Sequence, residues 1–265
     1  MRPRSLGFRT DLMVRRLAGS EISDHGDHIV VRSPLSPNFY WGNFLLLSAT
    51  AAVHRADRWF EEFGRQFPNA RHVAIGWDRR SQRALAALKP LQRLGLELET
   101  SLVMTAAAPL GPSSPASLME LRRLSASADW RALEALEIEL WQQDGGGGPT
   151  HLDFLESRVA ECRRLSQTGH AGYFGCFEAG RLVSSAGVVV GHRLGRFQNV
   201  QTAGDRWRRG LAGATVRMAA AFAQQQLGAR QLVIVADPAG PAVSLYRRLG
   251  FQDTEKQIGL QLVRA

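Results

Sequence analysis

The stretch NVQTAGDRWRRGLAGA, residues 199–214, decides how this chain of 265 residues is interpreted. A segment with the pattern of a β-strand ends at Thr202, and apolar residues at helical spacing begin at Leu211. A short basic loop that contains Gly210 joins the two. The sequence therefore predicts a strand, a basic loop and then the N-terminus of a helix.

A helix that begins in this way favours anions. Its first backbone N–H groups have no partner within the helix, and the helix dipole is positive there, so phosphate binds readily. Gly210 and Gly213 carry no side chain that would keep a ligand from the backbone, and Arg208 and Arg209 can add charge-assisted hydrogen bonds. Neither the Walker A pattern nor the dinucleotide-binding fingerprint is present. The alternative is a plain connection with solvated arginines.

Strand and helix patterns continue on both sides of this loop, across residues 117–265. A helix is expected after Ser127, which can serve as its N-cap, and Gly250 suits the left-handed end of the last helix. The order is β-α-α-β-β-β-α-β-α-β. The other expected helices cover residues 151–165, 211–227 and 242–249, and the expected strands cover 118–124, 172–178, 182–190, 196–202, 232–236 and 256–263.

The first half repeats part of this pattern. Residues 70–78 read ARHVAIGWD and residues 229–237 read ARQLVIVAD, and each is followed by a similar string, LQRLGL at 91–96 and YRRLGF at 246–251. The recurrence predicts a duplicated α/β unit, although short apolar strings can also match by chance. The expected fold is α/β (α+β), with tandem mixed central sheets flanked by helices. Its domains cover 1–108 and 117–265, joined by a Pro- and Ser-rich linker at 109–116.

The basic loop and the string SLYRRLGF at 244–251 together resemble the GNAT superfamily of N-acetyltransferases. That family has [Q/R]-x-x-G-x-[G/A] between its fourth strand and third helix, then a strand, then a helix that reads Asn/Ser-x-Tyr-x-x-x-Gly-Phe. The similarity covers residues 117–265 and includes the order of elements. It implies a GNAT acyl-CoA-binding domain in the second half and a degenerate GNAT-like domain in the first.

The resemblance also implies roles for individual residues. Tyr246 is the expected general acid, which protonates the leaving thiolate. The implied function is transfer of an acetyl group from acetyl-CoA (coenzyme A) to an amine of an unidentified small-molecule or peptide acceptor by direct attack. The residues expected to bind the cofactor are Val200 and Thr202 at the pantetheine arm, Arg208, Arg209, Gly210, Leu211, Ala212 and Gly213 around the pyrophosphate, and Ser244.

This chain departs from the family pattern at two positions. Trp207 occupies the [Q/R] position, and Gln201 stands where family members often have glutamate on the fourth strand. An amide cannot accept a proton, so no general base is assigned; Glu178, His192 and Asp237 are the other candidates. In the first half, Leu91 matches Tyr246, the basic loop has no counterpart, and the cluster YWGN at 40–43 is either core or part of an acceptor site.

Two functions other than acetyl transfer are considered. The net charge of +9 is carried almost entirely by arginine, because Lys89 and Lys256 are the only lysines. Basic surfaces attract nucleic acid, but no expected helix gathers arginine and aromatic residues on one face, so nucleic-acid binding is not favoured. A non-catalytic acyl-CoA sensor or interaction module is the other alternative.

The remaining expectations concern location and assembly. Two cysteines, Cys162 and Cys176, form neither a disulfide framework nor a metal site. No apolar run is long enough to span a membrane, and the first residues lack the apolar stretch of a signal peptide. A cytoplasmic protein is expected, and a homodimer is left open.

Overall fold

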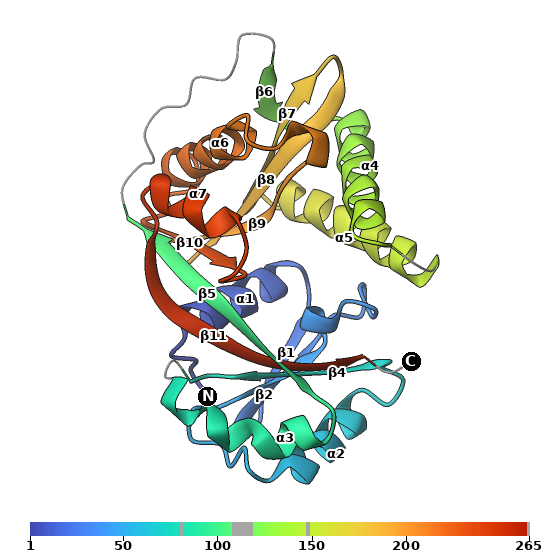
Figure 1. Ribbon diagram of the computed structural model, residues 1–265, viewed down its shortest axis with the longest axis vertical. Helices are drawn as coiled ribbons and strands as arrows, with labels where there is room; N and C mark the ends of the chain where they lie inside the picture. The colour runs from blue at the N-terminus through green and yellow to red at the C-terminus, as the bar shows by residue number, and fades with distance from the viewer. Residues whose placement is uncertain (80–81, 108–118, 147–148, 264–265) are drawn as a thin grey trace. The chain divides into compact units, whose positions relative to one another are not determined.

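The computed structural model describes residues 1–79, 82–107, 119–146 and 149–263. Its chain forms two compact units, each assembled from separate stretches of sequence (Figure 1). Unit 1 contains Met1–Met104, Val235–Gly240 and Asp253–Ala265, and unit 2 contains Thr105–Ile234 and Pro241–Gln252. No helix in these described ranges is long and apolar enough to cross a membrane.

Unit 1 is a mixed sheet with the strand order β1-β2-β3-β4-β11-β5. Neighbouring strands β3 and β4 are parallel, and helix α2 makes the connection that a parallel pair requires. The elements are α1 (Leu6–Leu17), β1 (Glu21–Asp24), β2 (His28–Arg32), η1 (Tyr40–Gly42), β3 (Phe44–Leu47), α2 (Ala56–Gln66), β4 (His72–Trp77), η2 (Gln82–Leu88), α3 (Lys89–Arg93), β5 (Glu97–Ala106) and β11 (Gln252–Val263).

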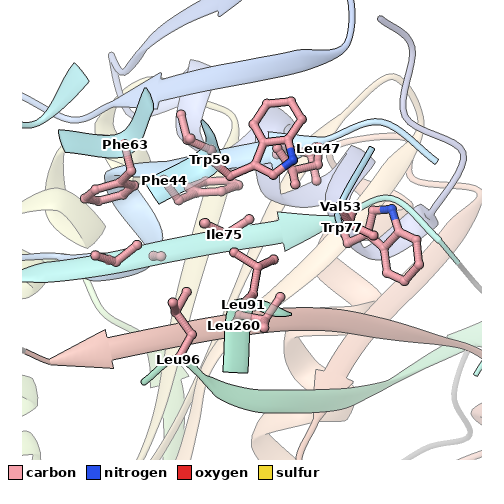
Figure 2. Packing of buried hydrophobic residues seen from close by; sticks show 14 of the residues in the cluster. Phe44, Leu47, Val53, Trp59, Phe63, Ile75, Trp77, Leu91, Leu96 and Leu260 are labelled. Atoms are coloured by element: carbon pink, nitrogen blue, oxygen red, sulfur yellow. The ribbon is translucent and has the colours of Figure 1, made fainter. Parts of the chain in front are cut away.

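The core of unit 1 is built from strands that are apolar on both faces. All four residues of β3 are buried, as are all six of β4, which is typical of strands covered by helices on both sides. Trp59 and Phe63 of α2 lie four residues apart and are fully buried with Ile75 and Leu260 (Figure 2). Trp59 and Phe63 are therefore part of the core of unit 1.

Unit 2 contains strands in the order β10-β9-β8-β7-β6, antiparallel except for the pair β9 and β10. Helices α4 and α5 cover one face and α6 the other (Figure 1): on β7, Tyr173 meets Trp130 of α4, whereas the next residue, Phe174, meets Phe222 of α6. The elements are β6 (Glu120–Arg123), α4 (Ser127–Gln143), α5 (Pro149–Gln167), β7 (Ala171–Glu178), β8 (Arg181–Gly191), β9 (Leu194–Thr202), η3 (Gly204–Arg206), α6 (Leu211–Gln225), β10 (Gln231–Ala236) and α7 (Ala242–Arg248).

The start of α4 differs from the prediction. Ser127 is the first residue of the helix, and Ala126 is the N-cap and makes no side-chain capping bond. Asp129 replaces the expected cap, because its Oδ2 accepts hydrogen bonds from the backbone N–H groups of Ser125 (2.8 Å) and Ala126 (2.9 Å). The prediction for Gly250 is confirmed: it follows α7 with φ of +97°.

The two units repeat one arrangement, a strand, a helix and a parallel strand: β3-α2-β4 in unit 1 and β9-α6-β10 in unit 2. The final strand does not stay with the second half of the sequence. Strand β11 pairs antiparallel with β4, from Ile258 opposite Trp77 to Val263 opposite His72, so it belongs to unit 1. The linker expected at 109–116 lies outside the described residues.

Candidate functional site

Strands β9 and β10 separate after a short paired stretch. They pair only from Leu194–Gln231 to Arg196–Val233, yet β9 continues to Thr202 and β10 to Ala236. The residues of β9 from 198 to 202 are only partly buried, whereas Gly195 and Arg196 of the paired stretch are buried. This side of β9 therefore presents backbone hydrogen-bonding groups that β10 does not use, in the region where Val200 and Thr202 were predicted to bind the cofactor.

A bulge interrupts β9 beside this opening. Pairing to β8 runs from Gly187–Gln198 directly to Ser185–Gln201, so Asn199 and Val200 together face a single residue. Asn199 adopts φ of +50°, a left-handed conformation that asparagine tolerates better than most residues. The bulge changes the direction of the backbone at Val200.

A chain of hydroxyl groups connects the end of β9 to the start of α6. Ser184, which is fully buried, donates to the carbonyl of Gln201 (2.9 Å) and lies 2.9 Å from the hydroxyl of Thr202. Its oxygen is also 3.5 Å from Thr215 Oγ1, which donates to the carbonyls of Leu211 and Ala212 in the first turn of α6. These bonds hold the predicted pantetheine strand and the predicted pyrophosphate helix together.

The N-terminus of α6 follows the prediction closely. Gly210 is the N-cap, with φ of +79° and no atom within 4 Å of the position that a Cβ would occupy. The first backbone bond into the helix comes from Ala214, so the N–H groups of Leu211, Ala212 and Gly213 precede it. Gly213 differs from the prediction in one respect: its missing side chain faces Leu245 and Leu249 around α7 instead of opening a path to the backbone.

The arginines of the loop divide into two groups. Arg206 is committed to acidic neighbours, because its Nε lies 2.5 Å from Glu178 and its Nη1 2.6 Å from Asp205. Arg209 is half exposed, and its contact with Glu178 is longer, at 3.7 Å. Arg208, left-handed with φ of +63°, makes no hydrogen bond or ion pair with any residue that the structure describes. Arg208 and Arg209, the two arginines predicted to contact the pyrophosphate, are thus less committed to acidic neighbours than Arg206.

Trp207 projects from the same loop. Its side chain is 62% exposed, and its Nε1 donates to the carbonyl of Thr202 at 2.9 Å. The indole therefore occupies the carbonyl of a residue that was predicted to hold the pantetheine arm.

Tyr246 lies on α7 with its ring buried against Phe251. Burial raises the pKa of the Tyr246 hydroxyl to about 12, so the group stays protonated at neutral pH. The hydroxyl makes no hydrogen bond with the described residues. Ser244, on the same helix, is exposed.

The candidates for a general base have other partners or lie in other places. Glu178 is paired with Arg206, His192 is exposed in the turn between β8 and β9, and Asp237 accepts a hydrogen bond from the Ala239 N–H at 2.9 Å. Gln201 has a buried amide nitrogen that makes no hydrogen bond with the described residues.

A carboxylate that sequence reasoning missed lies directly behind the bulge. Glu137 of α4 is 3% exposed, and its Oε1 accepts a hydrogen bond of 2.6 Å from the side-chain amide of Asn199. The same amide is 3.7 Å from the sulfur of Cys162 on α5. Burial and the charge of Glu137 raise the pKa of the Cys162 thiol to about 12. A signal was present, because Glu137 follows Leu133 by four residues and so falls on the apolar face of the helix.

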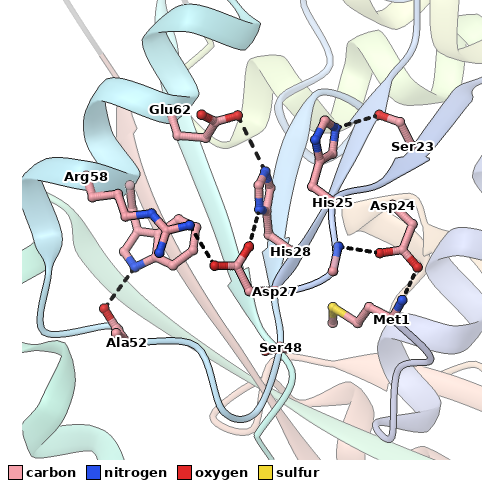
Figure 3. A network of polar contacts seen from close by, with 12 residues as sticks. Met1, Ser23, Asp24, His25, Asp27, His28, Ser48, Ala52, Arg58 and Glu62 are labelled. Carbon is pink, nitrogen blue, oxygen red and sulfur yellow. Dashed lines mark hydrogen bonds and ion pairs between the residues drawn. The ribbon is translucent and has the colours of Figure 1, made fainter.

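Unit 1 has a polar cluster of a different kind (Figure 3). The ring of His28 is buried, with Nδ1 2.8 Å from Asp27 and Nε2 3.4 Å from Glu62, and Arg58 pairs with Asp27 at 2.6 Å. Burial alone would raise the pKa of Asp27, but the bonds from His28 and Arg58 bring it below its usual value. These contacts join β2 to α2 within unit 1, although His28 Nε2 makes no hydrogen bond with the described residues.

The cluster at 40–43 is part of the core as well. Tyr40 stacks on His72 with ring centres 4.4 Å apart, and Trp41 lies over Gly259. The side chain of Asn43 accepts from the Ser33 N–H at 2.9 Å and donates to the carbonyl of Phe39 at 2.9 Å. Of the two interpretations left open by the sequence, packing is the one that the structure supports.

Comparison with known proteins places this geometry in context. Residues 173–258 match the family described as FR47-like protein, and no curated protein matches the chain. A functionally unknown conserved protein from Staphylococcus epidermidis has a similar structure, with a TM-score of 0.75 and 12% identity over 94% of this chain and 96% of that one. A GCN5-related N-acetyltransferase from Kribbella flavida gives a TM-score of 0.67 and 12% identity over 98% and 96%.

A third similar structure is a tandem GNAT protein from the clavulanic acid biosynthesis pathway, with a TM-score of 0.55 and 12% identity over 94% of this chain and 87% of that one. At such identities the likeness shows the fold. The predicted resemblance to the GNAT superfamily is confirmed at that level, and so is the α/β fold with a GNAT-like arrangement in tandem.

Proposed function

We propose that unit 2 binds acetyl-CoA beside β9 and transfers the acetyl group to an amine of a small-molecule or peptide acceptor. The observation that carries the proposal is the separation of β9 from β10 next to the helix end at Gly210. A thioester ligand with a long amide-bearing arm and a pyrophosphate needs both features: a strand edge for the arm and a cluster of N–H groups for the phosphates.

The residues present fit such a ligand. The edge of β9 at Val200 would hold the pantetheine arm, while Arg208, Arg209 and the N–H groups that follow Gly210 would hold the pyrophosphate. Acetyl-CoA supplies an acyl carbon that an amine can attack and a thiolate that can leave. Arginine beside N–H groups at a helix end gives charge-assisted hydrogen bonds, which are about twice as strong as neutral ones.

Proton transfers complete the chemistry. As the C–N bond forms and the C–S bond breaks, the amine loses a proton to water or base and the sulfur must gain one. The Tyr246 hydroxyl is protonated at neutral pH and makes no hydrogen bond with the described residues, so it can donate the second proton. The backbone N–H of Val200, reoriented by the bulge, is suited to stabilise the negative charge that develops on the carbonyl oxygen.

One observation favours a second function, acyl-CoA sensing without catalysis. Gln201 cannot take up a proton, and the carboxylates considered as bases are engaged elsewhere. A sensor would bind acetyl-CoA and show no turnover with any amine, which separates it from a transferase.

Calorimetric titration with acetyl-CoA and coenzyme A tests the proposal. Wild-type protein is compared with Gly210→Glu and with the control Gly228→Glu. Both glycines are left-handed with open space around them and flank α6 at opposite ends. A carboxylate about 6 Å from a phosphate costs roughly 1–3 kcal/mol for each pair of charges, so Gly210→Glu should weaken binding at least fivefold and Gly228→Glu should not. Equal affinity in both variants, or no binding by folded wild-type protein, refutes the proposal.

A further inference from the structure

Glu137 of α4 is a buried carboxylate that is only partly paired with its neighbours. Its side chain is 2% exposed, and its Oε2 makes no hydrogen bond with any described residue. The nearest cation is Arg158 of α5, whose Nε lies 3.5 Å from that oxygen. Burying a carboxylate with incomplete pairing costs free energy, which an apolar residue at the same place would avoid. The cost suggests that Glu137 contributes something other than stability.

Its one short contact is to the bulge in β9. The hydrogen bond from Asn199 Nδ2 to Glu137 Oε1 is 2.6 Å long, the range of a charge-assisted bond. Asn199 is held at a second point, because Ser185 Oγ donates to its backbone carbonyl at 3.2 Å. The side chain and the carbonyl of this left-handed residue are therefore both fixed, one by α4 and the other by β8.

The two contacts matter because a left-handed conformation is not the preferred state of asparagine. Such a conformation costs roughly 1–2 kcal/mol for a residue with a side chain, so an unsupported bulge would exchange with a regular strand or with other bulge geometries. Each alternative would turn the peptide group between Asn199 and Val200 in another direction. A hydrogen bond to a buried carboxylate is strong enough to decide that equilibrium.

We propose that Glu137 is a positioning residue that acts through the Asn199 amide to hold the β9 bulge, and with it the Val200 N–H, in one orientation. The inference rests on the proposed function, since the orientation matters for catalysis only if an acyl group is bound beside β9. A donor fixed in advance stabilises charge on the carbonyl oxygen without reorganisation. Displacement of a reacting group by about 1 Å can reduce the rate roughly 100-fold.

Four variants and one control test this role. Glu137→Ala removes the acceptor, whereas Glu137→Gln keeps an oxygen that can accept the bond from Asn199. Asn199→Gly adopts a positive φ without support, so it should make Glu137 dispensable for the bulge. The fourth variant combines Glu137→Ala with Asn199→Gly. The control is Glu134→Ala, one turn earlier on α4, because Glu134 makes no hydrogen bond or ion pair with the described residues.

Hydrogen–deuterium exchange of the β9 amides gives a readout that needs neither ligand nor acceptor. Exchange at residues 198–201 should rise about tenfold or more in Glu137→Ala, return most of the way in Glu137→Gln, and stay at the wild-type value in Glu134→Ala. In the Asn199→Gly background, adding Glu137→Ala should change exchange less than twofold. Thermal unfolding of each variant identifies any that fail to fold, and Glu137→Gln and Asn199→Gly remain informative if Glu137→Ala is one of them.

Kinetics then separate positioning from general stability. With an amine that the wild-type protein acetylates, kcat of Glu137→Ala should fall about 10- to 100-fold while the Kd for acetyl-CoA changes less than twofold, because the phosphate site at α6 is untouched. Wild-type exchange and wild-type kcat in Glu137→Ala overturn the inference, as does a Glu137→Gln variant that loses as much as Glu137→Ala. Failure of wild-type protein to bind acetyl-CoA overturns the proposed function instead. The exchange data then test only whether Glu137 holds the β9 bulge in one conformation.

Discussion

Replacing Trp207 by arginine should tighten the binding of acetyl-CoA. The position lies three residues before Gly210, between Arg206, which is already paired with Glu178 and Asp205, and Arg208, which is unpaired among the described residues. The indole is 62% exposed, so no core packing is lost on its removal. The substitution also frees the carbonyl of Thr202, which now accepts the indole N–H at 2.9 Å.

The size of the effect follows from Coulomb's law. Opposite unit charges about 6 Å apart attract by roughly 0.7 kcal/mol in water and by about 3 kcal/mol at the effective dielectric of a protein surface. The exposed position favours the lower part of this range. A gain of about 1–2 kcal/mol corresponds to affinity that is about 5- to 30-fold higher.

Calorimetry at low and high salt measures this gain, with Trp207→Gln as the control that removes the indole without adding charge. The advantage of Trp207→Arg over Trp207→Gln should shrink as salt rises, because exposed charges are screened. If arginine binds acetyl-CoA no better than glutamine at low salt, then the phosphates do not lie near this loop, and the assignment of the cradle is wrong.

Three further substitutions test other parts of the structure. Tyr246→Phe should lower kcat about 100-fold and leave the Kd for acetyl-CoA unchanged, because only the proton that general acid catalysis requires is removed; an unchanged kcat in steady-state assays would assign the role elsewhere. Burial alone would raise the pKa of Asp129, but backbone bonds and Arg122 lower it, so Asp129 stabilises the fold above pH 4 and loses that contribution as pH falls through its lowered pKa. Urea unfolding should therefore show Asp129→Asn to be about 1–2 kcal/mol less stable than wild type at pH 7 and the difference to shrink in acid; a difference that grew in acid would contradict this sign. A Cβ added at Gly187 would lie 2.3 Å from the Tyr173 ring, so Gly187→Ala should cost about 1–3 kcal/mol in thermal unfolding, and an unchanged Tm would show that the ring moves freely.

The sequence was sufficient for the elements whose patterns are local. The strand expected at 182–190 is β8, Arg181–Gly191, and α6 begins at Leu211 as expected. In each case a run of apolar residues, or a change from alternating to helical spacing, is contained within the segment itself. The left-handed end of the last helix at Gly250 could be predicted equally well, since glycine is favoured there.

Features that depend on distant residues could not be predicted in this way. The position of β11 beside β4 depends on long-range pairing, which the local pattern of β11 does not encode. Glu137 was overlooked because a glutamate in an amphipathic helix is ordinarily exposed, and its burial here depends on α5 and on the β9 bulge. The aspartate cap at α4 was missed because Ser127 is an equally suitable residue by type.

The order of the two units along the sequence affects how the protein folds during its synthesis. The first stretch of unit 1 is complete before residue 105, but its strand β11 is synthesised about 150 residues later. In the sheet, β11 lies between β4 and β5. At about 5–20 residues per second, ribosomes need roughly 7–30 s to synthesise the residues between β5 and β11. During that time the edge of β4 has no partner on this side, and an unpaired strand edge invites association with other chains. A nascent chain released before β11 should therefore aggregate, and fragments cut at the midpoint of the sequence should fold only when both are present.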